Sequence, residues 1–524
     1  MIQPLYNAGF IREAMFHIKG ATNEASLWPD DQRALVLWLQ QITLLPLIFG
    51  SEDDIYIARS LFEENFRQLL SFATSGSFHL APSSLPAATL QLCYHGKNDL
   101  GLIQLVSGTF RRLSPALGDD EVGIMPLRRQ LSSKLPNKSH MESIGDNEDS
   151  SEIYRIKVTI VSAHFRWHSV CRALCPTFEK LAQLEDIDII VAFAPTSHMD
   201  GVSQRVLSAA SGVIYLSSDL AKSRMQLYET ASTILLYTDV GMNSWTTSLA
   251  HARLAPVQLA MWGHHGSSGL PSIDYYVIAD AFEPFQSNSK HSEQLVRMET
   301  GLGVYLRRTD FTRRGNRKKG DPISRFDLGI RDNAKLYICA QSLPKFHPSF
   351  DYSLRRILEF DSEAVIIVPV DRRGQNGWLS LLKDRLLNSL GIEKRCRIVF
   401  CDLLSEEGMF ELLSIADVSL DTYPVGGGIT SLESLGNSVP TVTCAACQSV
   451  IRTTSAALTT MGISNLTAGD PDDFARLAVR TANDGDFNSA MRDLLRKRST
   501  LLFERDEVVE EWKGFINQLQ KLFI

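Results

Sequence analysis

The sequence predicts an α/β protein with two Rossmann-like units, preceded by a region that contains only helices. From about residue 153 onward, short β-branched runs alternate with helical patterns, which is typical of a parallel sheet flanked by helices. A polar, basic stretch divides this alternation into two parts. With 524 residues, the chain is long enough for two or three domains that each bury a sizeable core.

Helical periodicity marks the N-terminal region. Apolar side chains recur at helical spacing in residues 51–70, and Ser51 and Asp54 offer a helix start signal. Residues 10–25 resemble one arm of a tetratricopeptide-like hairpin, yet no second copy follows at a fixed period. We therefore expect an all-helical region over residues 1–131, without a repeat array.

Two polar stretches separate the expected domains. Residues 132–152 are polar and poor in apolar side chains, which predicts a linker. Residues 307–330 carry a cluster of Lys and Arg side chains that we interpret as a basic connector, with a nuclear-localisation or polyanion-binding patch as the alternative. The two Rossmann-like domains are then expected at residues 153–306 and 331–524.

Each Rossmann-like domain has its own set of strand-like runs. In the first domain and then in the second, we expect strands at residues 156–161, 187–191, 213–216, 234–237, 257–261 and 275–278, and at 335–339, 365–370, 397–400, 418–421 and 441–443. Helical patterns lie between them, so both sheets should be parallel.

Composition and charge narrow the classes of function. A net charge of −7 argues against a nucleic-acid binder of the wholly electrostatic kind. The most apolar run, residues 42–49, is far shorter than the roughly 18 residues of a membrane helix, and no secretory signal is visible. We expect a cytoplasmic, possibly nuclear, protein with reduced cysteines. Cys444 and Cys447 have redox or zinc spacing, but no second pair accompanies them.

Lys345 is the first candidate for chemistry. Ligands of open α/β sheets bind beyond the carboxyl ends of the strands, and Lys345 lies in a loop that follows one such strand. Its ammonium group could neutralise a diphosphate that gains negative charge as its bond breaks. The alternative is an ordinary solvated lysine.

A glycine-rich loop is the second candidate. Residues 426–428 are all glycine and stand between a strand and a helix, so the backbone could approach a phosphate at the helix start. Thr430 and Glu433 also have the spacing of a capping box. From the spacing alone, capping of the helix is the favoured role for both residues. The run is neither a dinucleotide fingerprint nor a Walker loop, so nicotinamide and ATP chemistry lose support.

Histidines at strand ends are the third candidate. His164 and His168 follow the first expected strand, and His264 and His265 follow another. Histidine can accept a proton near neutral pH or bind substrate hydroxyls. A metal site is the alternative, but it would need further ligands at metal spacing. We expect no metal here.

Taken together, these stretches resemble the family of nucleocytoplasmic protein O-GlcNAc transferases, whose relatives include Spindly-type O-fucosyltransferases and bacterial cytoplasmic N-glucosyltransferases. The likeness spans roughly residues 153–520. It implies a GT-B fold, inversion at the anomeric centre and no metal or cofactor. The matching pieces are GMNSWTT at 241–247, RLAPVQ at 253–258, WGHHGSSG at 262–269, IDY at 273–275, HSEQLVR at 291–297, Lys345, ADVSLDTYP at 416–424 and ESL at 433–435.

The resemblance implies a donor site in the C-terminal half. Lys345 matches the family lysine on the donor diphosphate, Thr430 matches the segment that cradles phosphate, and Glu433 matches the acidic residue that holds the ribose hydroxyls. This match raises the ribose role of Glu433 above capping. The predicted donor-binding residues are Lys345, Gly427, Gly428, Thr430, Ser431 and Glu433.

The resemblance also implies catalytic positions. His168 matches a histidine once proposed as the base, and His264 matches a position close to donor and acceptor; with Lys345 they form the predicted catalytic set. Departures from the family pattern are His164 in place of an acidic residue and Met409 in place of a histidine.

The expected function is transfer of GlcNAc from UDP-GlcNAc to Ser or Thr of a protein or peptide acceptor. Three alternatives stay open. The donor could be UDP-glucose or GDP-fucose, the chain could be a catalytically weak protein-binding scaffold, or the Rossmann-like halves could serve a dinucleotide-dependent oxidoreductase. We expect neither a membrane nor a nucleic acid as partner.

Overall fold

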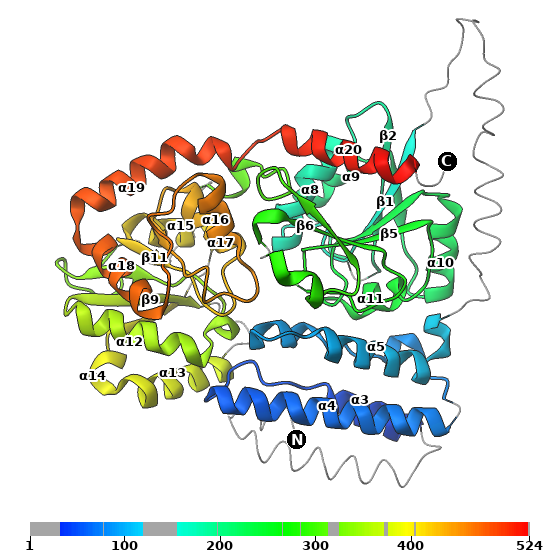
Figure 1. The fold of residues 1–524 in the computed structure, drawn as a ribbon, viewed down its shortest axis with the longest axis horizontal. Coiled ribbons are helices and arrows are strands. Elements are labelled where there is room, and N and C mark those ends of the chain that lie inside the picture. Colours follow the sequence, from blue (N-terminus) through cyan, green and yellow to red (C-terminus); the bar gives the residue numbers. More distant parts are fainter. Residues whose placement is uncertain are drawn as a thin grey trace, which may run out of the picture.

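The structure is a computed structural model and describes residues 32–76, 78–118, 155–195, 197–264, 266–282, 285–312, 324–370, 376–402 and 405–521. Two α/β domains lie side by side above a layer of helices (Figure 1). The expected linker 132–152, the hairpin-like segment 10–25 and residues 313–323 of the expected connector fall outside the described residues.

The layer of helices, hereafter the helical layer, is formed by α3 (Gln32–Ile42), α4 (Glu52–Ser75), η1 (Pro82–Ser84), η2 (Leu90–His95), α5 (Leu100–Leu113) and η3 (Pro115–Gly118). The predicted start of α4 is confirmed, because the Ser51 side chain accepts a hydrogen bond from the backbone N–H of Asp54. Phe66 of α4 packs against Phe110 of α5 with ring centroids 6.2 Å apart. The apolar faces of α4 and α5 thus form a core of their own.

The N-terminal α/β domain is built on a parallel sheet. Within the described residues this sheet has seven strands in the order β3-β2-β1-β4-β5-β6-β7. Its strands are β1 (Ile156–Ser162), β2 (Ile187–Phe193), β3 (Gly212–Tyr215), β4 (Ile234–Tyr237), β5 (Val257–Met261), β6 (Tyr275–Ala279) and β7 (Gln294–Met298), and its helices are α8 (Ser169–Leu181), α9 (Gly201–Ala209), α10 (Leu220–Glu229) and α11 (Ser244–Ala250). The six strands expected from sequence are confirmed, whereas β7, which is only partly buried, was not expected.

The C-terminal α/β domain contains a second parallel sheet. Its described strands follow the order β10-β9-β8-β11-β12. They are β8 (Lys335–Ile338), β9 (Ala364–Val370), β10 (Ile398–Asp402), β11 (Val418–Leu420) and β12 (Thr441–Val442), and the helices are α12 (Asp351–Phe360), α13 (Asn376–Leu390), α14 (Ile392–Arg395), α15 (Glu406–Ile415), α16 (Ile429–Gly436), α17 (Thr453–Thr460), α18 (Pro471–Asn483) and α19 (Gly485–Arg498). The five expected strands are confirmed at these positions.

The last described helix, α20 (Glu507–Lys521), returns to the N-terminal domain (Figure 1). Its Trp512 donates a hydrogen bond to the carbonyl of Gly303 over 2.9 Å, and Lys513 lies 3.3 Å from a carboxylate oxygen of Asp186. The sequence boundary 331–524 groups α20 with the C-terminal domain, but these contacts join it to the other one.

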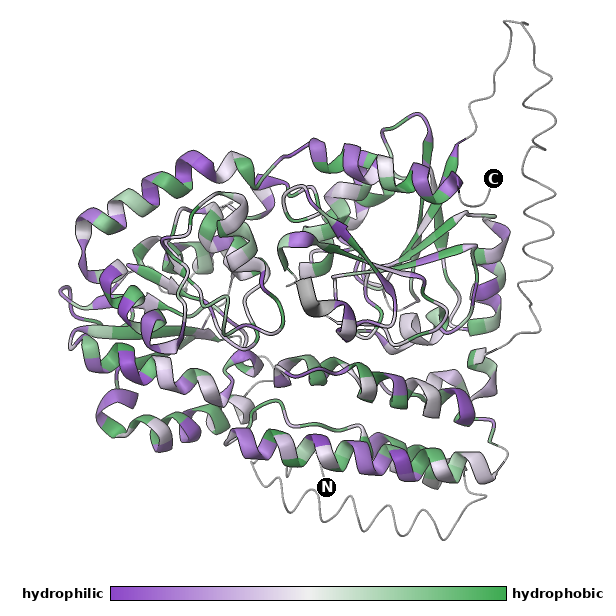
Figure 2. Ribbon diagram, in the orientation of Figure 1, coloured by the Kyte–Doolittle hydropathy of each residue, from purple (hydrophilic) through white to green (hydrophobic). Residues whose placement is uncertain are grey.

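Apolar residues of both sheets belong to one continuous core. The strands of both domains are mostly hydrophobic, while α19 and α20 carry many hydrophilic residues (Figure 2). Full burial on both faces is the usual environment of parallel strands, and it explains why the strand runs could be recognised in the sequence. Among the described helices, none has the length and apolar character needed to cross a membrane.

Candidate active site

A cleft with a volume of about 270 Å³ lies between the two α/β domains. Its walls come from the start of α8, the loops that follow β4, β5 and β8, and the start of α16, and η2 of the helical layer closes one side. This is the place where open α/β sheets bind ligands, beyond the carboxyl ends of their strands. The lining side chains include Tyr94, His168, Trp262, His264, Lys345 and Leu432.

The cleft brings together four of the eight residues predicted from sequence. His168, His264, Lys345 and Gly428 line it. The other four do not line it: Gly427, Ser431 and Glu433 are buried, and Thr430 is half-buried on the first turn of α16. The site therefore has lining residues from both domains and a supporting layer behind them.

Lys345 stands at the end of the short 3-10 helix η7 (Leu343–Lys345), in the loop that follows β8. Its Nζ donates a hydrogen bond to Oε1 of Gln341 over 3.3 Å, and no carboxylate forms an ion pair with it in the part of the chain that the structure describes. Burial lowers the pKa of Lys345, although the nearby charge of Asp421 opposes this effect. An anion entering the cleft would meet an amino group that no carboxylate pairs with, and its negative charge would favour the protonated form of Lys345.

Asp421 organises the glycine loop from beneath. It is fully buried at the end of β11 and accepts hydrogen bonds from the N–H of Gly427 (2.6 Å), from Thr443 (2.8 Å) and from Gln448 (2.6 Å). A Cβ at Gly427 would lie only 2.0 Å from Oγ of Ser431. Gly427 is thus required by the packing of the loop itself; it does not line the cleft, and its role in donor binding stays a prediction.

Gly428 is the glycine that faces the cleft. No atom lies within 4 Å of the position that its Cβ would occupy. It is also the N-cap of α16, and no side chain caps this helix start. The first amides of α16 can therefore point at a ligand, which is the arrangement that favours phosphate at a helix N-terminus.

The capping box suggested by the spacing of Thr430 and Glu433 is not formed. Glu433 instead accepts a hydrogen bond from Nη2 of Arg172 over 2.6 Å, and both side chains are buried. Arg172 belongs to α8, so this ion pair joins the two α/β domains. Residues 261 positions apart form it, which is why local spacing could not reveal it.

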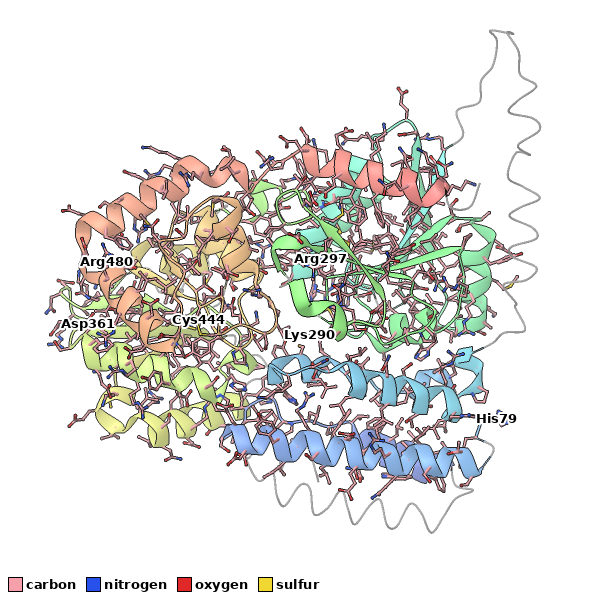
Figure 3. All side chains as sticks on the ribbon, viewed as in Figure 1. His79, Lys290, Arg297, Asp361, Cys444 and Arg480 are labelled. Atoms are coloured by element: carbon pink, nitrogen blue, oxygen red, sulfur yellow. A yellow bond between two sulfur atoms is a disulfide. The ribbon has the colours of Figure 1, made fainter. Side chains whose placement is uncertain are left out.

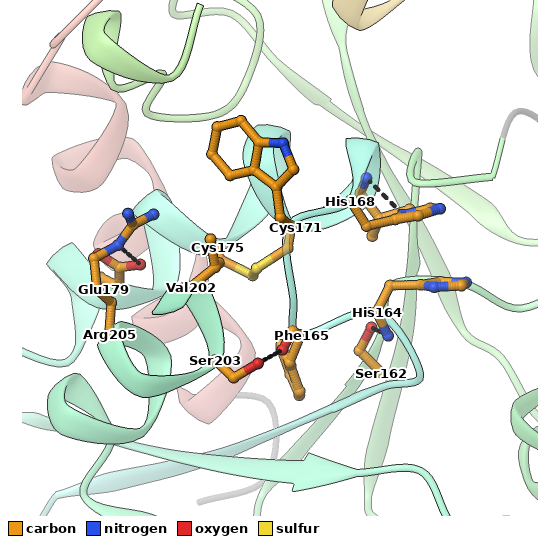
Figure 4. Close-up of a disulfide and its surroundings, with 12 residues drawn as sticks. Ser162, His164, Phe165, His168, Cys171, Cys175, Glu179, Val202, Ser203 and Arg205 are labelled. Carbon is orange, nitrogen blue, oxygen red and sulfur yellow. Dashed lines mark hydrogen bonds and ion pairs between the residues drawn. A yellow bond between two sulfur atoms is a disulfide. The ribbon is translucent and has the colours of Figure 1, made fainter. Parts of the chain in front are cut away.

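His168 is the N-cap of α8, and its ring stacks on that of His164 with centroids 4.0 Å apart (Figure 4). Its Nδ1 accepts a hydrogen bond from the backbone N–H of Val170 over 3.2 Å. Burial lowers the pKa of His168 to about 3, so the ring is neutral at pH 7. With Nδ1 accepting, the proton of the neutral ring sits on Nε2. His168 can donate a hydrogen bond into the cleft but is poorly suited to act as a base.

His264 is also neutral but differs from His168 in its hydrogen bonds. It follows β5, is only 5% exposed, and neither ring nitrogen has a hydrogen-bond partner among the described residues. Burial lowers its pKa to about 4, so it is neutral at pH 7 and keeps one nitrogen that can accept a proton. Gly241 lies against this ring, because a Cβ there would sit 3.1 Å from it. This contact explains why glycine suits position 241.

Asp239 does not line the cleft but lies behind His164, and sequence reasoning missed it. It is fully buried two residues after the end of β4, accepts a hydrogen bond from the N–H of Ala163 over 2.8 Å, and lies 3.8 Å from Nε2 of His164. Burial raises the pKa of Asp239 to about 7. Its position at the carboxyl end of a buried parallel strand was the signal that could have identified it.

Two pairs of cysteines form disulfides, Cys171–Cys175 within α8 and Cys444–Cys447 after β12. The prediction of reduced thiols is wrong for these four residues. Their Cα atoms are 4.8 and 5.2 Å apart, which is within the range that a disulfide spans. In α8 the two cysteines are one turn apart and share a helix face, close to His168 (Figure 4).

No group of three or more His, Cys, Asp or Glu side chains is arranged to hold a metal ion within the described ranges. The predicted absence of a metal stays a prediction.

Four fully buried histidines should make the folded protein sensitive to acid. Burial lowers the pKa of His95 and His251 to about 3 and that of His264 and His347 to about 4. The unfolded chain binds protons at these positions below about pH 6.5, whereas the folded chain resists them until about pH 4. Stability is therefore complete above pH 6.5 and decreases as the pH falls toward 4.

Thermal unfolding measured at pH 7.5, 6 and 5 checks this expectation. Each histidine should contribute a loss of up to about 2 kcal/mol in the free energy of unfolding between pH 6.5 and pH 5. A melting temperature that stays constant down to pH 5 would mean that these rings are hydrated or already charged in the folded protein.

Comparisons with known proteins find similarity to glycosyltransferases. A family model described as glycosyl transferase family 41 matches residues 322–510. A probable UDP-N-acetylglucosamine--peptide N-acetylglucosaminyltransferase SPINDLY from Eustoma exaltatum subsp. russellianum is 29% identical over 250 residues, which are 47% of this chain and 26% of that protein. The corresponding protein SEC from Arabidopsis thaliana is 22% identical over 297 residues, 55% of this chain and 29% of that protein. The chain thus matches less than a third of the length of these curated relatives.

Among solved structures, an O-GlcNAc transferase from Thermobaculum terrenum has a similar fold. The match has a TM-score of 0.60 at 17% sequence identity and covers 100% of this chain and 96% of the other. At this identity the likeness concerns the fold, including the helical layer that precedes the two α/β domains.

Proposed function

We propose, from the premise that this chain is a member of glycosyltransferase family 41 with a GT-B fold, that it transfers GlcNAc from UDP-GlcNAc to Ser or Thr side chains of proteins. The proposal includes inversion at the anomeric carbon and independence of metal ions. One observation carries it: Lys345 and the open start of α16 at Gly428 line the same cleft as His168 and His264.

The donor diphosphate would lie between Lys345 and the first amides of α16. The acceptor oxygen forms a bond to the anomeric carbon, and the bond from that carbon to the β-phosphate oxygen breaks on the opposite face. UDP leaves with the electron pair, and Lys345 and the α16 amides stabilise its added negative charge. Holding both reactants in one cleft makes this single displacement effectively unimolecular.

The proton of the acceptor hydroxyl would pass to His264. This ring is neutral and has an unpaired nitrogen, and it lines the cleft. His168 would donate a hydrogen bond from Nε2 to an oxygen of the donor, because its other nitrogen already accepts from Val170. The two histidines thus have different roles: His264 as the base and His168 as a hydrogen-bond donor.

The identity of the donor is tested by titration calorimetry with UDP and with GDP, followed by mass detection of modified Ser, Thr and Asn peptides. Binding of UDP and a mass increase of one GlcNAc on Ser or Thr support the proposal. Binding of GDP with transfer of fucose, or transfer of glucose from UDP-glucose, would replace the proposed donor. Binding of neither nucleotide would favour the protein-binding scaffold. The names of the curated relatives support UDP-GlcNAc as the donor.

Glu433 offers a test of how ribose is bound. If its carboxylate holds the ribose hydroxyls, Glu433→Gln should weaken UDP binding about 10- to 100-fold, since a hydrogen bond to a charged group is worth about 1.5 to 3 kcal/mol. The variant Arg172→Met removes this partner of Glu433, and with it the hydrogen bond of Arg172 to the carbonyl of Asp310 and its contacts with the rings of Trp167 and Phe311. It should lower stability by about 3 to 5 kcal/mol, because a buried charge loses its partner, and leave UDP affinity nearly unchanged.

Titration calorimetry and chemical denaturation of both variants separate the two roles. If Glu433→Gln binds UDP as tightly as the wild type and only loses stability, the carboxylate serves the contact between the domains and the ribose role is wrong.

A further inference from the structure

A second cavity adjoins the active-site cleft. It has a volume of about 50 Å³, and Cys93, His264 and Ile451 line both spaces. The helical layer, the N-terminal domain and the C-terminal domain all contribute to its walls. Lys290 lies at this junction of the three parts (Figure 3).

The lining of this second cavity is cationic. Lys97, Lys290 and Arg452 line it, together with one carboxylate, that of Asp99. Asp99 is already bound by Arg59, which lies behind it with an N–O distance of 2.6 Å. Three cationic side chains and one carboxylate thus line the cavity, and a fourth cation, Arg59, already pairs with that carboxylate, in a chain whose overall net charge is −7. A local excess of positive charge that opposes the overall charge favours an anionic ligand.

Neither of the two lysines in this lining forms an ion pair with a carboxylate in the part of the chain that the structure describes. Nζ of Lys97 donates to the hydroxyl of Tyr56 over 2.7 Å, and this partner is neutral. Lys290 has no hydrogen bond or ion pair within the described ranges, and its charge acts on Asp99 only at a distance. A bound anion could therefore pair with Lys290 without breaking an existing contact.

The size of the cavity limits what it can hold. One water molecule needs about 10 to 15 Å³ of such volume, so the cavity has room for about four waters. The carboxylate end of an Asp or Glu side chain fits this space, whereas a nucleotide or a second hexose does not. The cavity is thus suited to one anionic side chain.

We propose that the second cavity binds an acidic side chain of the protein acceptor, close in sequence to the Ser or Thr that receives the sugar. The inference rests on the proposed function. His264 forms part of the wall between the cavities, so a hydroxyl that reaches it from the cleft places neighbouring acceptor residues beside the second cavity. An extended chain advances about 3.4 Å per residue, so the acidic residue should lie within about three positions of the acceptor.

Peptide acceptors with a central Ser or Thr, in a background of Ala and Gly, test this proposal. One series carries Asp at each position from three before to three after the acceptor, and a matched series carries Asn. With the wild-type protein, at least one Asp position should raise kcat/KM about ten-fold over its Asn counterpart. Lys290→Glu should abolish this preference and favour Lys at the same position, and Lys290→Met should abolish it without a new preference.

Lys222→Glu is the matched control, because Lys222 is exposed on α10 and does not line either cavity. Its Asp preference and donor KM should equal those of the wild type. Equal rates for the Asp and Asn peptides with the wild-type protein would overturn the inference and leave the proposed function intact. A raised donor KM for Lys290→Met would assign Lys290 to the donor site and also overturn it. Absence of transfer to any peptide from any donor would overturn both.

Discussion

Replacing Lys345 with methionine is expected to lower kcat by about 100- to 1,000-fold, the usual cost of removing one group that stabilises developing charge. The protein should stay folded, because methionine has a similar length. The change also removes an amino group whose charged form is disfavoured by burial, as its lowered pKa indicates. Donor KM should rise less than kcat falls, since the leaving diphosphate gains charge only as its bond breaks.

Lys335 offers a matched control. It stands at the amino end of β8, the strand whose carboxyl end leads to Lys345, and it does not line the cleft. Lys335→Met should keep wild-type turnover. Steady-state kinetics and thermal unfolding of both variants measure the difference, and near-normal turnover of Lys345→Met would remove the main support for the proposed mechanism.

Replacing His264 with glutamine is expected to lower kcat by about 100- to 10,000-fold, the range of general base catalysis. The glutamine can fill much of the space of the imidazole but cannot accept the proton. Affinity for UDP should change little, because Lys345 and the start of α16 hold the diphosphate in the proposed mechanism. The matched control is His251→Gln, since His251 is equally buried at the end of α11 and lies outside the cleft.

The pH profile gives this prediction a second measurement. kcat/KM reports the free enzyme, in which the pKa of His264 is about 4. Its basic form persists as the pH falls, so the acid limb of the profile should lie near pH 4 to 5 and not near 6.5. Assays must be brief enough to precede acid unfolding. Turnover of His264→Gln within about three-fold of the wild type would point to another base, and Asp239 acting through His164 would be the next group to test.

The sequence predicted the fold best where burial requires a local pattern of apolar residues. Strands buried on both faces need β-branched and apolar runs, so the sheets could be predicted from residues such as those of β4 and β9. The strand ends then located Lys345, His168 and His264, because parallel sheets place their ligand sites there. The order of the strands, the extra strand β7 and the return of α20 depend on packing between distant segments.

What only the tertiary structure decided is which partner each polar group has. Spacing suggested that Glu433 caps α16, but Arg172 from the other domain binds it. Two adjacent glycines looked equivalent, yet Gly427 makes room for Ser431 while Gly428 faces the cleft. The hydrogen bond from the N–H of Val170 to Nδ1 of His168 places the proton of that ring on Nε2. Burial keeps His264 neutral and without a hydrogen-bond partner among the described residues. The sequence by itself determined the elements and the loops that carry the chemistry, because local patterns encode burial and strand ends. The roles of individual side chains were decided by contacts between residues far apart in the chain, which no local pattern records.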